Sequence, residues 1–221
     1  MCIITMKKED IKSEELRDIL CVKTDRWDYE EITDEDLSSV RSVEIPGRKL
    51  TGELTDINLR ELTALNHLEE LTIMDFEISD SINDILKELP ELKVLKFGNC
   101  DFNDCSSIKT VKGLRVFSIF GGKNVNMTSF PSAQFVQFDG VEVPFGSIDF
   151  DTLRNARFDH CRVIDAFDVE DRENVEGIEF IDSLMYSKKD GDGKRKKMEI
   201  LRVPDGATFE MEYSDEDSLD R

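Results

Sequence analysis

The sequence predicts an α/β solenoid, with a parallel β-sheet on its concave face and helices or extended return segments on its convex face. Two observations predict this class. A short apolar pattern recurs along the chain, and its copies begin between 19 and 28 residues apart. The longer spacings also contain apolar residues at helical intervals, which supply a second layer behind the strands.

Each copy has an apolar first residue, followed by apolar residues three and five places later and, in six of the eight copies, ten places later. The alternation at three and five is typical of a strand with one buried face. One such strand cannot bury its own apolar side, so successive copies are expected to stack around a continuous core. The pattern can be placed eight times, with first residues Val40, Leu68, Leu92, Leu114, Ala133, Leu153, Val175 and Met198. The first copy ends on Leu50, and the last runs through Leu201 and Val203 to Thr208.

The clearest copy reads Leu92, Leu95, Phe97, Cys100 and Phe102. It resembles the leucine-rich repeat, whose signature is L-x-x-L-x-L-x-x-N/C-x-L with a period of 20 to 29 residues. The resemblance covers residues 37 to 210 and implies a leucine-rich-repeat solenoid with one short strand per copy. It also implies that the residue at position eight satisfies backbone groups in the turn after the strand, a role that falls here to Cys100 and Cys161.

The apolar positions of these copies predict one continuous core. Its members are Leu71, Ile73, Leu95, Phe97, Phe117, Ile119, Val136, Phe138, Phe158, Ile178, Phe180 and Leu201. Helices are expected in the long early returns. Helical spacing occurs at Ile82, Ile85, Leu86 and Leu89, and one copy earlier at Leu59, Leu62 and Leu65. The returns of the copies that start at Leu114 and Ala133 are too short for a full helix, so we expect them to be extended or to form a single short turn.

Residues 1–36 precede the repeat and are expected to cap the solenoid, because the first strand would otherwise expose its core side. Two short helices are predicted in this region, over Ser13–Cys21 and Thr33–Val40, with Thr33 as the N-cap of the second. A second interpretation makes Trp27 and Tyr29 a docking element for a partner.

The other end of the chain is strongly charged. Residues 211–221 read as an acidic tail. The loop Lys188–Lys197 is interpreted as a solvated hairpin tip, with a nuclear-import signal or a phosphate-binding patch as the alternative. A calcium loop starting at Asp190 is excluded, because Arg195 and Leu201 stand where such a loop needs glycine and glutamate.

The sequence contains no recognisable catalytic, cofactor-binding or metal-ligating pattern. Its two histidines are His67 and His160. His160 is followed by Cys161, but adjacent side chains of an extended segment point apart, so they are a poor nucleophile and base pair. We therefore expect neither enzymatic activity nor a cofactor.

The sequence shows no secretory signal and no membrane span. The first twenty residues contain no apolar signal-peptide core, and no stretch approaches eighteen apolar residues. Five cysteines, an odd number, fit reduced thiols. A cytoplasmic protein that does not contact the membrane is expected.

Positions two, four and six alternate with the buried positions and are expected to face the concave side. Position four is polar in every copy: Glu44, Thr72, Lys96, Ser118, Gln137, Arg157, Glu179 and Arg202. Apolar residues at positions two and six are expected to lie together over copies two to five: Met74, Val94, Val116, Phe120 and Phe135. An exposed patch of this kind is typical of a protein-binding site. The alternative is that a capping segment or neighbouring loops cover it.

The formal net charge of −20 argues against direct binding of nucleic acid and favours a partner with a basic surface. Two functions follow. The first is a non-catalytic interaction module that binds a partner protein through the concave face. The alternative is an acidic inhibitor, immunity protein or antitoxin that blocks the basic site of a nuclease or another nucleic-acid-binding enzyme.

Overall fold

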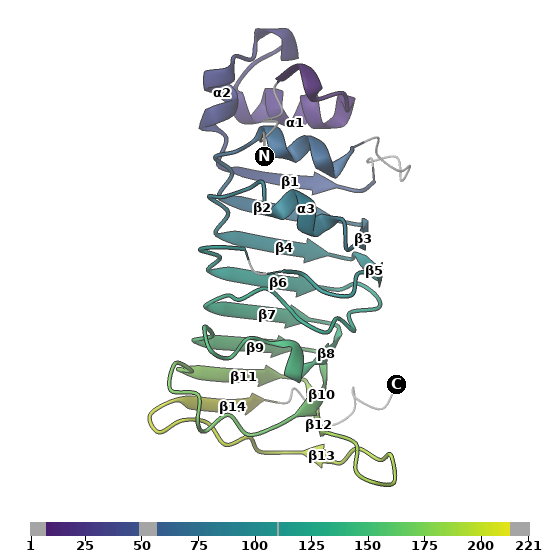
Figure 1. Ribbon diagram of the computed structural model, residues 1–221, viewed down its shortest axis with the longest axis vertical. Coiled ribbons are helices and arrows are strands. Elements are labelled where there is room, and N and C mark those ends of the chain that lie inside the picture. Colours follow the sequence, from purple (N-terminus) through teal and green to yellow (C-terminus); the bar gives the residue numbers. More distant parts are fainter. Residues whose placement is uncertain (1–7, 49–56, 110, 213–221) are drawn as a thin grey trace.

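The computed structural model describes residues 8–48, 57–109 and 111–212, and their chain winds into a solenoid (Figure 1). Within these residues, eight strands form one sheet in the order β1-β2-β4-β6-β7-β9-β11-β14. Every neighbouring pair is parallel. The strands are β1 Ser42–Pro46, β2 Glu70–Met74, β4 Val94–Gly98, β6 Val116–Phe120, β7 Phe135–Asp139, β9 Asn155–Asp159, β11 Gly177–Ile181 and β14 Thr208–Glu212. The predicted leucine-rich-repeat-like solenoid with a parallel sheet is confirmed.

Short strands that follow the main ones form two smaller sheets along the side of the solenoid (Figure 1). One pairs β3 (Glu77–Ser79) with β5 (Asp101–Asp104). The other has the order β13-β12-β10-β8. Its strands are β8 Glu142–Pro144, β10 Arg162–Ala166, β12 Leu184–Ser187 and β13 Lys197–Met198.

The return segments have the lengths and conformations that the spacing predicts. The early returns contain the 3₁₀ helix η3 (Leu59–Ala64) and the helix α3 (Ile82–Leu86). The return after β6 is extended, and the return after β7 contains a single 3₁₀ turn, η4 (Phe145–Ser147). Within the described ranges, no helix has both the length and the apolar character needed to cross a bilayer.

The twelve residues predicted to form the core are all buried. Phenylalanines from successive strands stack along the axis of the solenoid. Ring centroids are 6.2 Å apart between Phe117 and Phe138, 5.7 Å between Phe138 and Phe158, and 4.8 Å between Phe158 and Phe180. Because each ring contacts the next copy, the copies share one core.

A helical segment lies at the β1 end of the sheet (Figure 1). It comprises η1 (Lys8–Asp10), α1 (Glu14–Thr24), η2 (Tyr29–Glu31) and α2 (Asp34–Ser39). Leu16 and Leu20 of α1 are fully buried in the common core, so α1 covers the apolar end of the solenoid.

Both helices of this segment begin at side-chain caps. The Ser13 hydroxyl accepts a hydrogen bond from the N–H of Leu16. Thr33 and Asp36 form a reciprocal capping box at α2. The N–H of Thr33 and the guanidinium of Arg26 stabilise the Asp36 carboxylate and lower its pKa to about 2. Thr33 is thus the predicted cap of α2, whereas Ser13, predicted as part of the first helix, is the cap that precedes α1.

A left-handed turn ends nearly every main strand, seven places after the start of its copy. The residues there are Asp75, Asn99, Gly121, Gly140, His160 and Asp182, and all have positive φ. Their N–H groups donate to the last carbonyl of the next strand, as from Asn99 to Phe120 and from His160 to Ile181. Glycine, asparagine, aspartate and histidine are the residue types that adopt this conformation most readily. Residues of these types at position seven are therefore a sequence signal for the turn. The apolar pattern does not include this position, so the turns were not predicted.

The residue at position eight binds the turn, as the resemblance implied. The Cys100 thiol lies 3.4 Å from the Ile73 carbonyl oxygen, and the Cys161 thiol lies 3.2 Å from that of Asp159. Ser183 has the same position in a later copy. Its hydroxyl donates a hydrogen bond to the Phe158 carbonyl and accepts one from the Cys161 N–H. The predicted role of position eight is confirmed for Cys100 and Cys161, whereas Phe76 and Val141 at the same position have no polar side chain.

Gly122 provides a test of how closely successive turns pack. Its φ is +107°, and a Cβ atom added there would lie 2.6 Å from the carbonyl oxygen of Cys100. Gly140 also has a positive φ, but a Cβ there would meet nothing within 4 Å. We expect Gly122→Ala to lower the free energy of unfolding by about 3 kcal/mol and Gly140→Ala by about 1 kcal/mol, as measured by urea denaturation. Equal losses in the two variants would contradict the close approach of these turns.

The predicted position of the eighth copy is wrong. Residues 199–207 do not form the eighth strand, and Met198 ends β13, which pairs antiparallel with β12. The last strand of the sheet is β14, whose first residue, Thr208, pairs with Gly177 of β11. A turn at Asp205 and Gly206 precedes the strand and delays its start.

Three predictions concern the ends of the repeat. Leu201 is buried as expected, although it lies in a loop and not in the sheet. Leu50, assigned to the first copy, lies outside the described residues. The tail assigned to residues 211–221 begins within β14, and its part from 213 onward also lies outside them.

Candidate functional site

The exposed side of the eight-stranded sheet is the candidate site, and we call it the open face. It carries the side chains at positions two, four and six of each strand. Position four is occupied by polar residues in every strand, as predicted, except that Glu210 of β14 replaces Arg202. Arg202 instead pairs with Asp168 and Glu170 in the loop region.

Three of the predicted partner-binding residues form a row at position two. Val94, Val116 and Phe135 are register partners on the adjacent strands β4, β6 and β7. All three are half-buried, so each presents part of its side chain to solvent.

The other two meet at position six over a glycine. A Cβ atom at Gly98 would lie 2.3 Å from Met74 Sδ and 2.4 Å from Phe120 Cε2. Gly98 therefore makes room for Met74 and Phe120 to approach each other across β4. Both side chains are half-buried.

We call these five residues, Met74, Val94, Val116, Phe120 and Phe135, the apolar patch. The two groups lie on either side of the polar row at position four, in which Thr72 and Ser118 are buried. The described residues leave all five side chains partly exposed, so within these residues no capping segment or loop covers the patch completely.

The β7–β14 part of the open face is acidic. We call its carboxylates, Asp139, Asp159, Glu179, Glu210 and Glu212, together with the buried Asp182 in the turn after β11, the acidic end. Arg157 lies among them, with its guanidinium 3.0 Å from Glu179 and 3.4 Å from Asp159. Glu210 and Glu212 on β14 are exposed. The open face thus has an apolar half on β2–β7 and an acidic half on β7–β14.

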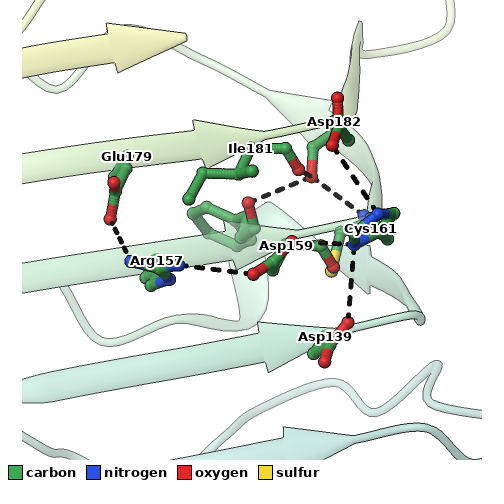
Figure 2. A network of polar contacts seen from close by, with 10 residues as sticks. Asp139, Arg157, Asp159, Cys161, Glu179, Ile181 and Asp182 are labelled. Atoms are coloured by element: carbon green, nitrogen blue, oxygen red, sulfur yellow. Dashed lines mark hydrogen bonds and ion pairs between the residues drawn. The ribbon is translucent and has the colours of Figure 1, made fainter. Parts of the chain in front are cut away.

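A histidine stands among three of these carboxylates. Figure 2 shows Asp139, Asp159 and Asp182 around the turn that follows β9. His160 Nδ1 lies 2.8 Å from Asp159 Oδ1 and 4.0 Å from Asp139 Oδ1. His160 Nε2 lies 3.6 Å from Asp182 Oδ2. Our sequence analysis did not bring these residues together; the signal was an aspartate at position six of two successive copies, followed by His160 at position seven.

The three buried cysteines of the described residues show no feature of a nucleophile. Cys100, Cys105 and Cys161 are buried, and burial raises the pKa of each thiol to about 11. A thiol of this kind is protonated at neutral pH and unreactive. His160 is exposed whereas Cys161 is buried, so the two side chains point apart as predicted.

Trp27 and Tyr29 do not form a joint docking element. Trp27 is 98% exposed, but Tyr29 is buried, and its hydroxyl donates to the carbonyl of Lys8 over 2.9 Å. The desolvation of Tyr29 raises its pKa to about 12. The prediction is wrong for Tyr29, because this ring packs between α1 and the segment before it.

The basic loop Lys188–Lys197 connects the antiparallel strands β12 and β13, as expected of a hairpin. Asp190 Oδ1 accepts hydrogen bonds from the N–H groups of Asp192 and Lys194. This carboxylate therefore stabilises the loop itself. Arg195 is held by Asp165, 3.0 Å away.

No protein-family model and no curated protein matches this chain. Among solved structures, the chain is similar to an internalin from Listeria monocytogenes, with 13% sequence identity and a TM-score of 0.39. The alignment covers 97% of this chain and 75% of the internalin. Such a likeness carries no argument about function, and the fold assignment rests on the parallel register of the strands.

Proposed function

We propose that this protein is a non-catalytic, cytoplasmic interaction module that binds a partner protein through the open face. The observation that carries the proposal is the apolar patch. Five apolar side chains gather on four neighbouring strands of a surface whose central row is polar. Soluble proteins rarely expose such a group without a binding role.

The composition of the patch suits a protein partner. Phe120 and Phe135 offer large apolar surfaces, and Met74 adapts its shape to the neighbour it contacts. The half-buried setting holds these side chains on a rigid sheet, so binding costs little additional ordering. Residues of this kind supply most of the binding energy in protein interfaces.

The charge of the open face suits a basic partner. The acidic end lies beside the apolar patch, since Asp139 is the register partner of Phe120. A basic surface would be attracted toward the acidic end and oriented before the apolar contacts form. Direct binding of nucleic acid is disfavoured, because phosphates would be repelled.

A second function is favoured by the clustering of carboxylates on β7–β14. An inhibitor or antitoxin that blocks the basic site of a nuclease needs carboxylates gathered in one region, and scattered charge would not serve. The gathering of the acidic end on four neighbouring strands fits that role. If the partner captured from the native host is a nuclease, loss of its activity on addition of this protein would identify the inhibitor function.

Charge steering gives a kinetic test of the proposal. In the variant Glu210→Gln with Glu212→Gln, association with the captured partner is expected to slow several-fold at low salt, while dissociation changes little. The matched control is Glu35→Gln with Glu88→Gln, which makes the same change in net charge at exposed residues of α2 and of the return after α3. Surface plasmon resonance at increasing salt measures both rates. Equal slowing in the two variants would show that the open face does not direct the encounter.

A further inference from the structure

We propose that Asp139, Asp159 and His160 bind a divalent transition-metal cation of the zinc class at the end of strands β7 and β9. One ligand atom from each residue lies within 4.8 Å of the other two. This proposal rests on the geometry of the turn after β9 and is independent of the proposed function.

The spacing of the three ligand atoms suits a small cation. His160 Nδ1 is 2.8 Å from Asp159 Oδ1 and 4.0 Å from Asp139 Oδ1. Ligand atoms about 2.0–2.2 Å from a tetrahedral zinc ion lie about 3.3 Å from one another. The observed distances bracket this value, so small rotations of the side chains would complete the site.

One ligand atom lacks a hydrogen bond in a buried position. Asp159 Oδ1 is almost inaccessible to solvent and accepts no hydrogen bond, although His160 Nδ1 is close to it. A buried carboxylate oxygen without a partner is costly. By contrast, His67 Nδ1 and Glu91 Oε1 are similarly close, at 2.9 Å, and do form a hydrogen bond. A cation between Asp159 and His160 would satisfy both atoms.

Asp182 is placed to orient the histidine. Its side chain is only 8% exposed, and its Oδ2 lies 3.6 Å from His160 Nε2, on the side of the ring away from Asp159. A metal-binding histidine commonly donates its second N–H to a carboxylate, which fixes the tautomer and the ring plane. Asp182 would take this role after a small movement and leave Nδ1 free for the metal.

The ligand types indicate the class of cation. An imidazole nitrogen with two carboxylates suits zinc and its neighbours among the transition metals. Calcium prefers six to eight oxygen ligands, which this turn does not offer. With three protein ligands, a fourth coordination position would stay open.

Isothermal titration of the full chain with zinc chloride tests the proposal. One tight site is expected in the unmodified protein, and His160→Asn and Asp139→Asn are each expected to weaken it by at least 100-fold. Asparagine is a conservative choice at 160, because Asn99 occupies the same left-handed turn position after β4, three strands earlier in the sheet. Asp182→Asn is expected to weaken zinc binding by about 10- to 100-fold.

The control is His67→Asn, which removes the other histidine and its contact with Glu91 and is expected to leave zinc binding unchanged. Thermal melts without zinc check that each variant is folded. Unchanged affinity in His160→Asn, or several weak sites of equal strength in the unmodified protein, would overturn the proposal. Anomalous diffraction at the zinc edge should place the ion between β7 and β9, and a peak elsewhere would also overturn it.

Discussion

Replacing Phe158 by alanine is expected to lower the free energy of unfolding by about 3–5 kcal/mol, because the change leaves a cavity in the shared core. The ring is fully buried and lies between those of Phe138 and Phe180, at centroid distances of 5.7 Å and 4.8 Å. Phe97 is equally buried, and Phe97→Ala is expected to have an effect of the same size. Urea denaturation measures both losses.

The same substitution on the open face serves as the control. Phe135 lies on the opposite face of the same sheet and is half-buried, so Phe135→Ala is expected to cost no more than about 1 kcal/mol. If Phe97→Ala and Phe158→Ala each lost less than about 1 kcal/mol, the assigned register of the strands would be contradicted.

The largest expected effect on binding comes from placing charge in the apolar patch. The double variant Phe120→Asp with Phe135→Asp removes both aromatic side chains and leaves carboxylates where the partner would have to desolvate them. Affinity for the partner is expected to fall by at least 100-fold, or about 2.7 kcal/mol. The fold should persist, because both positions are partly exposed to solvent.

The control for this variant adds the same two charges at another exposed apolar site. Val22 and Trp27 of the helical segment are 81% and 98% exposed. The variant Val22→Asp with Trp27→Asp is expected to bind the partner with unchanged affinity. It also tests Trp27 as a separate docking element, since a loss of binding there would move the site to that segment.

The sequence was sufficient to predict the core and the sheet, because both depend on local alternation. Positions three and five of each copy must be apolar, because they face the core. This requirement is met even in the divergent copies that start at Leu114 and Ala133. The same alternation placed Val94, Val116 and Phe135 side by side on the open face. The approach of Met74 to Phe120 depends on the missing side chain of Gly98, and the apolar pattern alone did not reveal it.

The wrong or missing predictions concern residues whose positions depend on the path of the chain and not on the local apolar pattern. Near the C-terminus, Leu201 and Val203 have the spacing of a strand, yet a hairpin and a turn at Gly206 delay β14. His160 and Asp182 are far apart in sequence and meet only because β9 and β11 are neighbours. Such contacts between copies require the register of the whole sheet.

Parallel titration of the captured partner with three proteins tests the role of the open face most directly. These are the unmodified chain, Phe120→Asp with Phe135→Asp, and Val22→Asp with Trp27→Asp, each shown by circular dichroism to be folded. We predict that only the first double variant loses at least 100-fold in affinity. Unchanged affinity in that variant would contradict binding through the open face.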